Sequence, residues 1–334
     1  MKEKLQILAI GDVVTDAFIE LLPAEAEIDH DKQKHPLLCM TYGTKIPFKE
    51  AIIINGVGNA ANAAVAFAKL DLTSALSSDI GDDTVGRDIL HALTSQGVST
   101  EFIKAHDGYK SNYHYVLWYK DDRTILIKHE TYKYAWPDIR AYQKPEWIYL
   151  SSLGESGGAI HEGLSDYLFT NPSVKLAFQP GTFQIREGVK KLHKLYAKTE
   201  IFAANKEEYQ QITDSNYQDE KILINKMHKL GPKILLLTDG PNGAYASDGK
   251  QVVFMPPYPD PKPPVDRTGA GDAYASTFTA AIMNDKTMAE GLAWAGINSC
   301  SVVQQVGAQA GLLSQPEIEA ELKTAPSSYK AKVI

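Results

Sequence analysis

The seven residues Asp266-Arg267-Thr268-Gly269-Ala270-Gly271-Asp272 follow Pro263-Pro264-Val265 and lead directly into the apolar stretch 273–283. Small residues therefore stand where a loop turns into a helix. Their backbone N–H groups are accessible and, with the positive end of the helix dipole, form a site for a phosphate group. A carboxylate beside such a site suits phosphoryl transfer, in which a base takes the proton of the acceptor. A glycine-rich turn with an Asp helix cap is the alternative.

Composition and charge narrow the class of protein. The chain has 334 residues, 44% of them hydrophobic, and a net charge of −7. A chain of this length can bury one large core or two smaller ones. The negative charge disfavours a nucleic-acid partner. Cys39 and Cys300 are far apart and form no metal-ligand pair. The chain begins with no signal-peptide pattern and contains no apolar run of membrane-spanning length, so we expect a soluble, cytoplasmic protein with no membrane partner.

The hydrophobic pattern alternates between short apolar runs and stretches with helical spacing. Alternating strands and helices predict a mostly parallel central sheet that is covered by helices on both faces. In such sheets, ligands bind at the carboxyl ends of the strands. We expect strands over residues 5–10, 74–80, 147–151, 174–178, 201–204 and 234–238, and helices over residues 59–70, 83–96, 160–169, 185–197, 219–230, 271–284 and 287–306.

Two segments interrupt this alternation. Residues 17–56 contain the charged run 29–34, which we expect to be a solvated loop, and a short strand over 51–54. Residues 112–131 consist of two β-rich arms around a charged turn, which predicts a hairpin. We expect these segments, about 17–56 and 109–133, to form a small β lid on a single domain spanning residues 1–334. Edge strands of the main sheet are the alternative.

Several motifs resemble one known family. Val57-Gly58-Asn59-Ala60-Ala61-Asn62 and the loop 266–272 are similar to the N-terminal and C-terminal signatures of the ribokinase-like (PfkB) carbohydrate kinases. That resemblance implies an α/β ribokinase-like three-layer sandwich. Shorter family elements follow in the same order along the chain, as Gly81-Asp82-Asp83 with Gly86-Arg87-Asp88, Asn205-Lys206-Glu207-Glu208, Thr238-Asp239-Gly240-Pro241-Asn242-Gly243 and Gly307-Ala308-Gln309.

The resemblance implies catalytic roles for the loop. Asp272 is expected to be the general base, with the helix dipole and backbone donors favouring its ionised form. Gly269, Ala270 and Gly271 are expected to supply the anion hole for the transferred phosphoryl group. Arg267 replaces the threonine common at its position, and it either reaches the ATP phosphates or is a solvated side chain.

For the acceptor, the resemblance implies binding by Asp16, Gly58 and Asn62. A carboxylate suits paired hydroxyl donors, and Gly58 lets the backbone approach a sugar. Asn62 stands in an alanine-rich helix, where helix propensity gives no reason for an asparagine. Val57 replaces the first glycine of the family pair, so the approach of the substrate is expected to be altered.

The resemblance also implies residues for the nucleotide and for metal ions. No Gly-x-x-x-x-Gly-Lys-Ser/Thr loop occurs, so ATP binding is expected to rest on the loop 266–272. Thr238, Gly240 and Gly243 are expected to line the ribose and phosphate side of the groove, and Asn298 to edge the adenine pocket. Asn205 and Glu208 are expected to organise water around Mg²⁺, although they also fit a helix capping box. Asp266 and Thr268 resemble the loop that holds a monovalent cation such as K⁺ in several members of the family.

The expected activity is that of an ATP-dependent kinase that phosphorylates a primary hydroxyl of a small sugar, such as ribose, fructose or a keto-sugar acid. A nucleoside kinase is the first alternative, because aromatic residues of the hairpin could stack on a base or pack in the core or an interface. A non-catalytic sugar or nucleotide sensor on the same scaffold is the second. His114 and His129 are expected to be surface residues. The free strand edges of a lid favour a homodimer through the lid.

Overall fold

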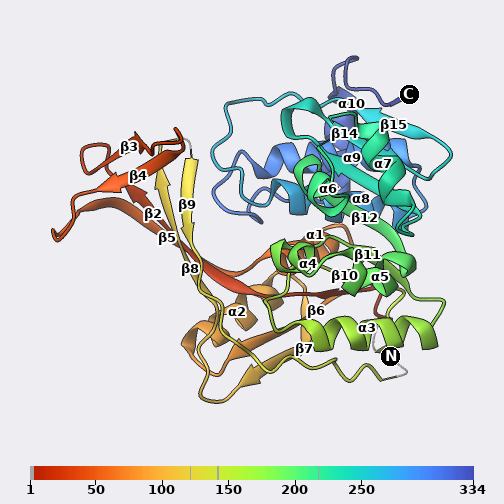
Figure 1. Ribbon diagram of the computed structural model, residues 1–334, viewed down its shortest axis with the longest axis horizontal. Helices are drawn as coiled ribbons and strands as arrows, with labels where there is room; N and C mark the ends of the chain where they lie inside the picture. Colours follow the sequence, from red (N-terminus) through yellow and green to blue (C-terminus); the bar gives the residue numbers. More distant parts are fainter. Residues whose placement is uncertain (1–3, 121, 141–142, 217) are drawn as a thin grey trace.

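A ten-stranded sheet runs through the centre of the computed structural model, which describes residues 4–120, 122–140, 143–216 and 218–334 (Figure 1). Each pair of neighbours in the series β13-β12-β11-β10-β1-β6-β7 is parallel, whereas the pairs β13–β14, β14–β15 and β15–β16 are antiparallel. The predicted mostly parallel sheet is therefore confirmed. In spatial order the strands are β16 (Lys332–Val333), β15 (Val252–Met255), β14 (Ala244–Ser247), β13 (Ile234–Thr238), β12 (Thr199–Asn205), β11 (Lys175–Phe178), β10 (Trp147–Leu150), β1 (Ile7–Ile10), β6 (Ser74–Gly81) and β7 (Ser99–His106).

The central strands are apolar on both faces. In β1, Ile7 and Ala9 pack into one buried cluster, while Leu8 and Ile10 pack into the other. Successive side chains of a strand point to opposite faces, so a continuous apolar run belongs to a strand that is covered on both sides. This is why the short runs in the sequence predicted buried parallel strands.

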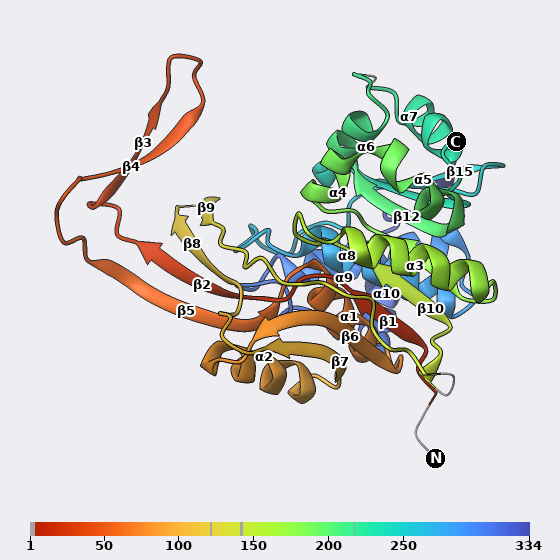
Figure 2. The same ribbon diagram turned by 60° about the horizontal axis from the view of Figure 1, so that its bottom comes forward.

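Helices cover both faces and complete three layers (Figures 1 and 2). Among the described residues, no helix is both long enough and apolar enough to cross a membrane. The helices on one face are α1 (Asn59–Lys69), α2 (Thr84–Ser95), α8 (Ala270–Met283), α9 (Met288–Val302) and α10 (Gln315–Thr324), and those on the other are α3 (Gly158–Thr170), α4 (Thr182–Glu187), α5 (Val189–Lys198), α6 (Lys206–Ile212) and α7 (Glu220–His228).

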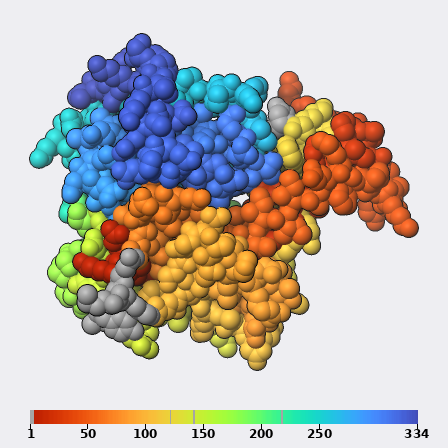
Figure 3. Space-filling model, turned by 180° about the vertical axis from the view of Figure 1, so that it is seen from behind, coloured from red at the N-terminus to blue at the C-terminus, as the bar shows by residue number. Residues whose placement is uncertain are grey.

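A separate small sheet projects from the side of the main body (Figures 2 and 3). Its strand order is β5-β2-β8-β9, and a further hairpin, β3 with β4, extends it. These segments are therefore not edge strands of the central sheet. Asp121, in the predicted turn, lies outside the described residues. The strands are β2 (Val14–Leu21), β3 (Ala26–His30), β4 (Pro36–Met40), β5 (Phe48–Val57), β8 (Tyr113–Tyr119) and β9 (Asp122–Leu126).

Two helix predictions were wrong in extent. The helix expected over 185–197 is divided into α4 and α5 at Gly188, whose φ of 81° lies in the left-handed region. Glycine adopts that conformation readily, and it interrupts the helix there. The helix expected over 287–306 ends at Val302, and turns replace its last residues.

Candidate active site

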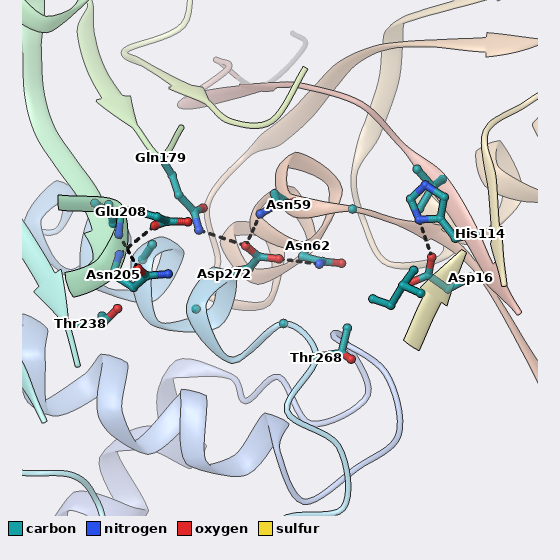
Figure 4. Close-up of a pocket in the computed structure, with 18 of the residues that line it drawn as sticks. Asp16, Asn59, Asn62, His114, Gln179, Asn205, Glu208, Thr238, Thr268 and Asp272 are labelled. Carbon is teal, nitrogen blue, oxygen red and sulfur yellow. Dashed lines mark hydrogen bonds and ion pairs between the residues drawn. The ribbon is translucent and has the colours of Figure 1, made fainter. Parts of the chain in front are cut away.

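A cleft of about 370 Å³, here called the main cleft, runs from the carboxyl ends of β12 and β13 to the small sheet (Figure 4). Ligands of parallel sheets bind at this edge. Of the predicted site residues, the main cleft brings together Asp16, Gly58, Asn62, Asn205, Glu208, Thr238, Thr268, Gly269, Gly271 and Asp272.

The loop before α8 needs a glycine at position 269. Gly269 has a φ of 78°, and a Cβ atom added to it would lie 2.3 Å from the Cβ of Ala308. The first N–H groups of an α-helix have no partner within the helix. Gly269 and Gly271 border the main cleft, and Ala270 borders a neighbouring cavity. The loop therefore presents its small residues at the junction of the two spaces.

Asp266 braces this loop. Its Oδ1 accepts hydrogen bonds from the backbone N–H of Thr268 at 2.9 Å and from the Thr268 hydroxyl at 2.7 Å. Its Oδ2 accepts from the backbone N–H of Gly307 at 2.9 Å. The two residues expected to hold a monovalent cation thus bond each other, and a cation at this place stays a prediction.

Asp272 lies on the first turn of α8, and three side-chain amides hold its carboxylate (Figure 4). Asn62 donates to Oδ2 at 2.8 Å, while Asn59 and Gln179 donate to Oδ1 at 3.0 and 3.1 Å. The hydroxyl of Tyr149 donates to Oε1 of Gln179. That bond fixes the Gln179 amide with its NH₂ group toward Asp272. The carboxylate is held in one orientation within the main cleft.

The electrostatics of Asp272 differ from expectation. Burial raises the pKa of its carboxyl group above the ordinary value, and the hydrogen bonds from Asn62, Gln179 and Asn59 oppose that shift. Burial disfavours the charged form, which explains the direction. The prediction that backbone donors favour the ionised form was therefore wrong in two respects. The donors to the carboxylate are side-chain amides, and the net shift of the pKa is upward.

The contacts of Asn62 connect it to Asp272. Its Nδ2 donates to the carboxylate, and its Oδ1 accepts from Gln309 Nε2 at 3.0 Å. Asn62 borders the main cleft but is only 5% exposed. The observed role is to position Asp272, and contact with a sugar stays a prediction.

Gly58 is required by the packing of the backbone. Its φ is 111°, and an added Cβ would lie 2.8 Å from the carbonyl oxygen of Asp12. Val57, next to it, is 2% exposed and pairs with Val14 in the small sheet. The Val57 side chain is buried and does not border the main cleft. The structure therefore gives no sign that Val57 alters the approach of a substrate.

Two histidines pair with carboxylates at the root of the small sheet. His114 Nδ1 lies 3.2 Å from Asp16 Oδ1, and His129 Nδ1 lies 3.4 Å from Asp12 Oδ2. The two imidazole rings are 5.1 Å apart. The expectation that both are surface residues was wrong, because the side chains are 13% and 24% exposed and point inward. The pairing of His114 with Asp16 depends on β2 and β8 being neighbouring strands, which no local pattern of the sequence shows.

Asn205 and Glu208 form the predicted capping box. Asn205 Oδ1 accepts from the backbone N–H of Glu208 at 2.8 Å, and Glu208 Oε2 accepts from the backbone N–H of Asn205 at 2.9 Å. Burial raises the pKa of Glu208, and the nearby charge of Asp272 adds to this shift. In the described part of the chain, no three His, Cys, Asp or Glu side chains gather into a metal cluster. Any divalent ion here would bind chiefly through water and ligand oxygens.

A second cavity of about 240 Å³ adjoins the main cleft on the other side of the loop. Thr238 borders both spaces. Gly240, Gly243 and Arg267, which were expected at the nucleotide, border this second cavity. Cys300 also borders it, and burial raises the pKa of its thiol to about 12.

The prediction for Asn298 was wrong. Its side chain is fully buried, donates to Thr277 Oγ1 at 2.7 Å and accepts from the backbone N–H of Leu313 at 2.9 Å. Both ends of the amide are thus used to join α8, α9 and the following turn. The next residues, Ser299 and Cys300, border the second cavity instead.

Comparison with known proteins places this geometry in a family. Residues 55–315 match the model of the pfkB family of carbohydrate kinases. An uncharacterized sugar kinase of Archaeoglobus fulgidus is 24% identical over 73% of this chain and 96% of its own length. The ribokinase of Bacillus subtilis is 25% identical over 78% of this chain and 86% of its own length.

Solved structures share the fold. The ribokinase of Arabidopsis thaliana, complexed with ribose and ATP, superposes with a TM-score of 0.76 at 21% identity, covering 96% of this chain and 99% of that one. A nucleoside kinase of Methanocaldococcus jannaschii gives a TM-score of 0.74 at 17% identity, covering 96% and 98%. The chain belongs to the pfkB family of carbohydrate kinases.

Proposed function

We propose that this kinase transfers the γ-phosphoryl group of ATP to a primary hydroxyl of a small sugar. The observation that carries the proposal is the carboxylate of Asp272, which is buried in the main cleft, oriented by three amides and placed one turn from a glycine-rich helix start. A base beside the backbone N–H groups of a helix start is the pair that phosphoryl transfer to an alcohol needs.

The transfer has one proton and one phosphoryl group to account for. Asp272 takes the proton of the acceptor hydroxyl while the alcohol oxygen bonds to the γ-phosphorus. The bond from that phosphorus to the bridging oxygen breaks, and its electron pair leaves with ADP. Backbone N–H groups of Gly269, Ala270 and Gly271 stabilise the charge on the transferred group. The raised pKa of Asp272 makes its carboxylate a stronger base once ionised.

The nucleotide is assigned to the second cavity, with its phosphates toward the loop. Thr238, Gly240 and Gly243 support this assignment because they border that cavity, and Arg267, which is exposed beside it, supplies a cation for the phosphates. Asn205 and Glu208 fit a Mg²⁺ ion held through water, because both border the main cleft and their oxygen atoms are its preferred ligands. Mg²⁺ would neutralise phosphate charge.

A sugar is favoured over a nucleoside by the lining of the small sheet. The side chains it contributes to the main cleft are those of Val14, Asp16, His114, Arg123 and Ile125, followed by Ile127. The tyrosines that could stack on a base do not border the cleft, and Tyr115 is 48% exposed on the other side of the strand. Stacking of these tyrosines on a nucleoside base in the main cleft is therefore not supported.

Coupled ADP release with MgATP tests the proposal, using ribose, fructose, 2-keto-3-deoxygluconate and four nucleosides as acceptors. Turnover with a sugar that Asp272→Asn abolishes would support it. Turnover with a nucleoside alone would replace sugar with nucleoside as the acceptor. If ATP binds and no acceptor stimulates turnover, a sensor on the same scaffold becomes the better account.

A further inference from the structure

Arg123 lies on the outermost strand of the small sheet and faces the main cleft. β9 pairs only with β8 in this sheet, as far as the described residues show. Alternate residues of a strand share a face, and Arg123, Ile125 and Ile127 all border the main cleft. The small sheet and the residues just after it therefore place one guanidinium beside two aliphatic side chains. They lie at the end of the main cleft where we propose that the acceptor binds.

Arg123 has one loose ion pair and leaves hydrogen-bond donors unused among the described residues. Its Nε is buried and has no hydrogen-bond partner among the described residues. Its Nη1 lies 3.7 Å from Asp266 Oδ1, which is beyond hydrogen-bond range. Asp266 already accepts bonds from Thr268 and Gly307. A guanidinium has five N–H donors, and leaving a buried donor unpaired costs free energy, so a bound ligand is the natural partner.

The carboxylate of Asp16, which was expected to bind the acceptor, does not pair with Arg123. Asp16 is paired with Nδ1 of His114, and Nε2 of His114 is buried without a hydrogen-bond partner in the described part of the chain. Asp272 is held by amides at another part of the cleft. Arg123 and His114 therefore each have a ring or guanidinium nitrogen that is available to hydrogen-bond a ligand. Of the two side chains, only that of Arg123 is always charged.

We propose that Arg123 binds an anionic group of the acceptor, a carboxylate or a phosphate that remains on the product. This inference rests on the proposed function and narrows its substrate to an acidic sugar. The planar fork of a guanidinium matches either anion with two parallel hydrogen bonds, whereas a neutral hydroxyl uses only part of it. Ile125 and Ile127 would cover the carbon skeleton beside that group.

The test compares acceptors that differ by one anionic group and keep a primary hydroxyl. The pairs are glucose with gluconate, fructose with fructose 1-phosphate, and ribose with ribose 1-phosphate. Each is assayed by coupled ADP release with the wild type, Arg123→Met, Arg123→Lys and the control Arg87→Met. Arg87 is an exposed arginine of α2 that lies 3.8 Å from Asp82 and does not border the main cleft.

We expect the wild type to prefer the anionic member of at least one pair. In Arg123→Met the ratio of kcat/KM for the anionic to the neutral acceptor should fall about 10- to 100-fold, mainly through KM, because a charged hydrogen bond is lost. Arg123→Lys should keep part of the ratio and Arg87→Met all of it. Preference for gluconate would identify a carboxylate, and preference for a sugar phosphate would identify a phosphate.

Two results would overturn the inference. An unchanged ratio in Arg123→Met would remove Arg123 from acceptor recognition. An equal loss of kcat with neutral and anionic acceptors would assign Arg123 to the transferred phosphoryl group. Failure of the proposed function looks different, because no acceptor would then release ADP. In that case calorimetry with gluconate and fructose 1-phosphate decides: binding to the wild type and not to Arg123→Met supports the inference, and binding to neither rejects it.

Discussion

The two ends of the main cleft are built differently. At the α8 end, Asp272 receives three hydrogen bonds from amides carried by α1 and by the residue after β11. At the end formed by the small sheet, Arg123 and His114 have buried nitrogen atoms without hydrogen-bond partners among the described residues. At one end the hydrogen bonds are satisfied within the chain, and at the other we propose that a ligand satisfies them.

This difference separates chemistry from recognition. The proposed base, Asp272, is held by the packed core, where preorganised groups do not need to rearrange during the reaction. The residues proposed to recognise the acceptor lie on a projecting sheet, where a change of side chain disturbs little else. Changes at the α8 end should therefore affect kcat, and changes at the lid end should affect the choice of acceptor.

Replacing the base should give the largest effect. Asp272→Asn keeps the shape and removes the proton acceptor, so kcat/KM should fall about 10²- to 10⁴-fold, the usual contribution of a general base. Steady-state ADP release measures this loss. Asp285→Asn, at an exposed residue after α8, is the matched control and should retain activity. Comparable activity in both variants would contradict the role of Asp272.

The loop itself can be broken at Gly269. Gly269→Ala forces a Cβ against Ala308 and a left-handed conformation on a residue that disfavours it. The free energy of unfolding should fall by about 1–3 kcal/mol, measured by urea denaturation. Gly271→Ala is the control, because an added Cβ there meets no atom within 4 Å. Equal stability of the two variants would show that the loop tolerates the strain.

Removing one amide should shift the pH profile. The hydrogen bond from Gln179 lowers the pKa of Asp272 against the effect of burial. Gln179→Leu should therefore raise that pKa further. Because a general base must be ionised to accept a proton, the acidic limb of kcat/KM should move to higher pH if Asp272 is that base. Gln96→Leu, at an exposed residue after α2, should leave the limb in place. A shift to lower pH would contradict the assignment.

The smallest effect is expected from the monovalent cation. Asp266 already accepts three hydrogen bonds and lies near Arg123. Replacing KCl by choline chloride at constant ionic strength should lower kcat/KM, by less than any of the changes above. Identical rates in the two salts would show that Asp266 and Thr268 serve only to brace the loop.

Sequence predicted the part of the fold that repeats a simple pattern. The central strands are buried on both faces, so their apolar runs are distinct, and the helices between them have clear spacing. The hairpin of β3 and β4 was missed because its strands are short and mostly exposed, and the charged run 29–34 lies across its turn. Strands β14 to β16 were missed because they are short and lie at one edge of the sheet.

For the candidate site as well, sequence patterns identified some residues and missed others. Asp272 and its loop were found because the small residues and the carboxylate form a recognisable run. Asn59 and Gln179 were missed because a single amide carries no pattern, although Gln179 follows a predicted strand at its carboxyl end. Asn298 was misplaced because an asparagine within a helix can face a cavity or bond inside the core, and only the packing distinguishes these.

The position of β9 has a consequence for how this enzyme could change over generations. A strand with one neighbour can accept a new side chain without repacking a core, whereas the residues around Asp272 contact several elements at once. Arg123 and Ile125 of β9, with Ile127 just after the strand, border the main cleft. Substitutions at a few positions of β9 and just after it can therefore change the substrate preference, while the loop 266–272 stays unchanged. Paralogues with new acceptors are expected to differ first at these positions.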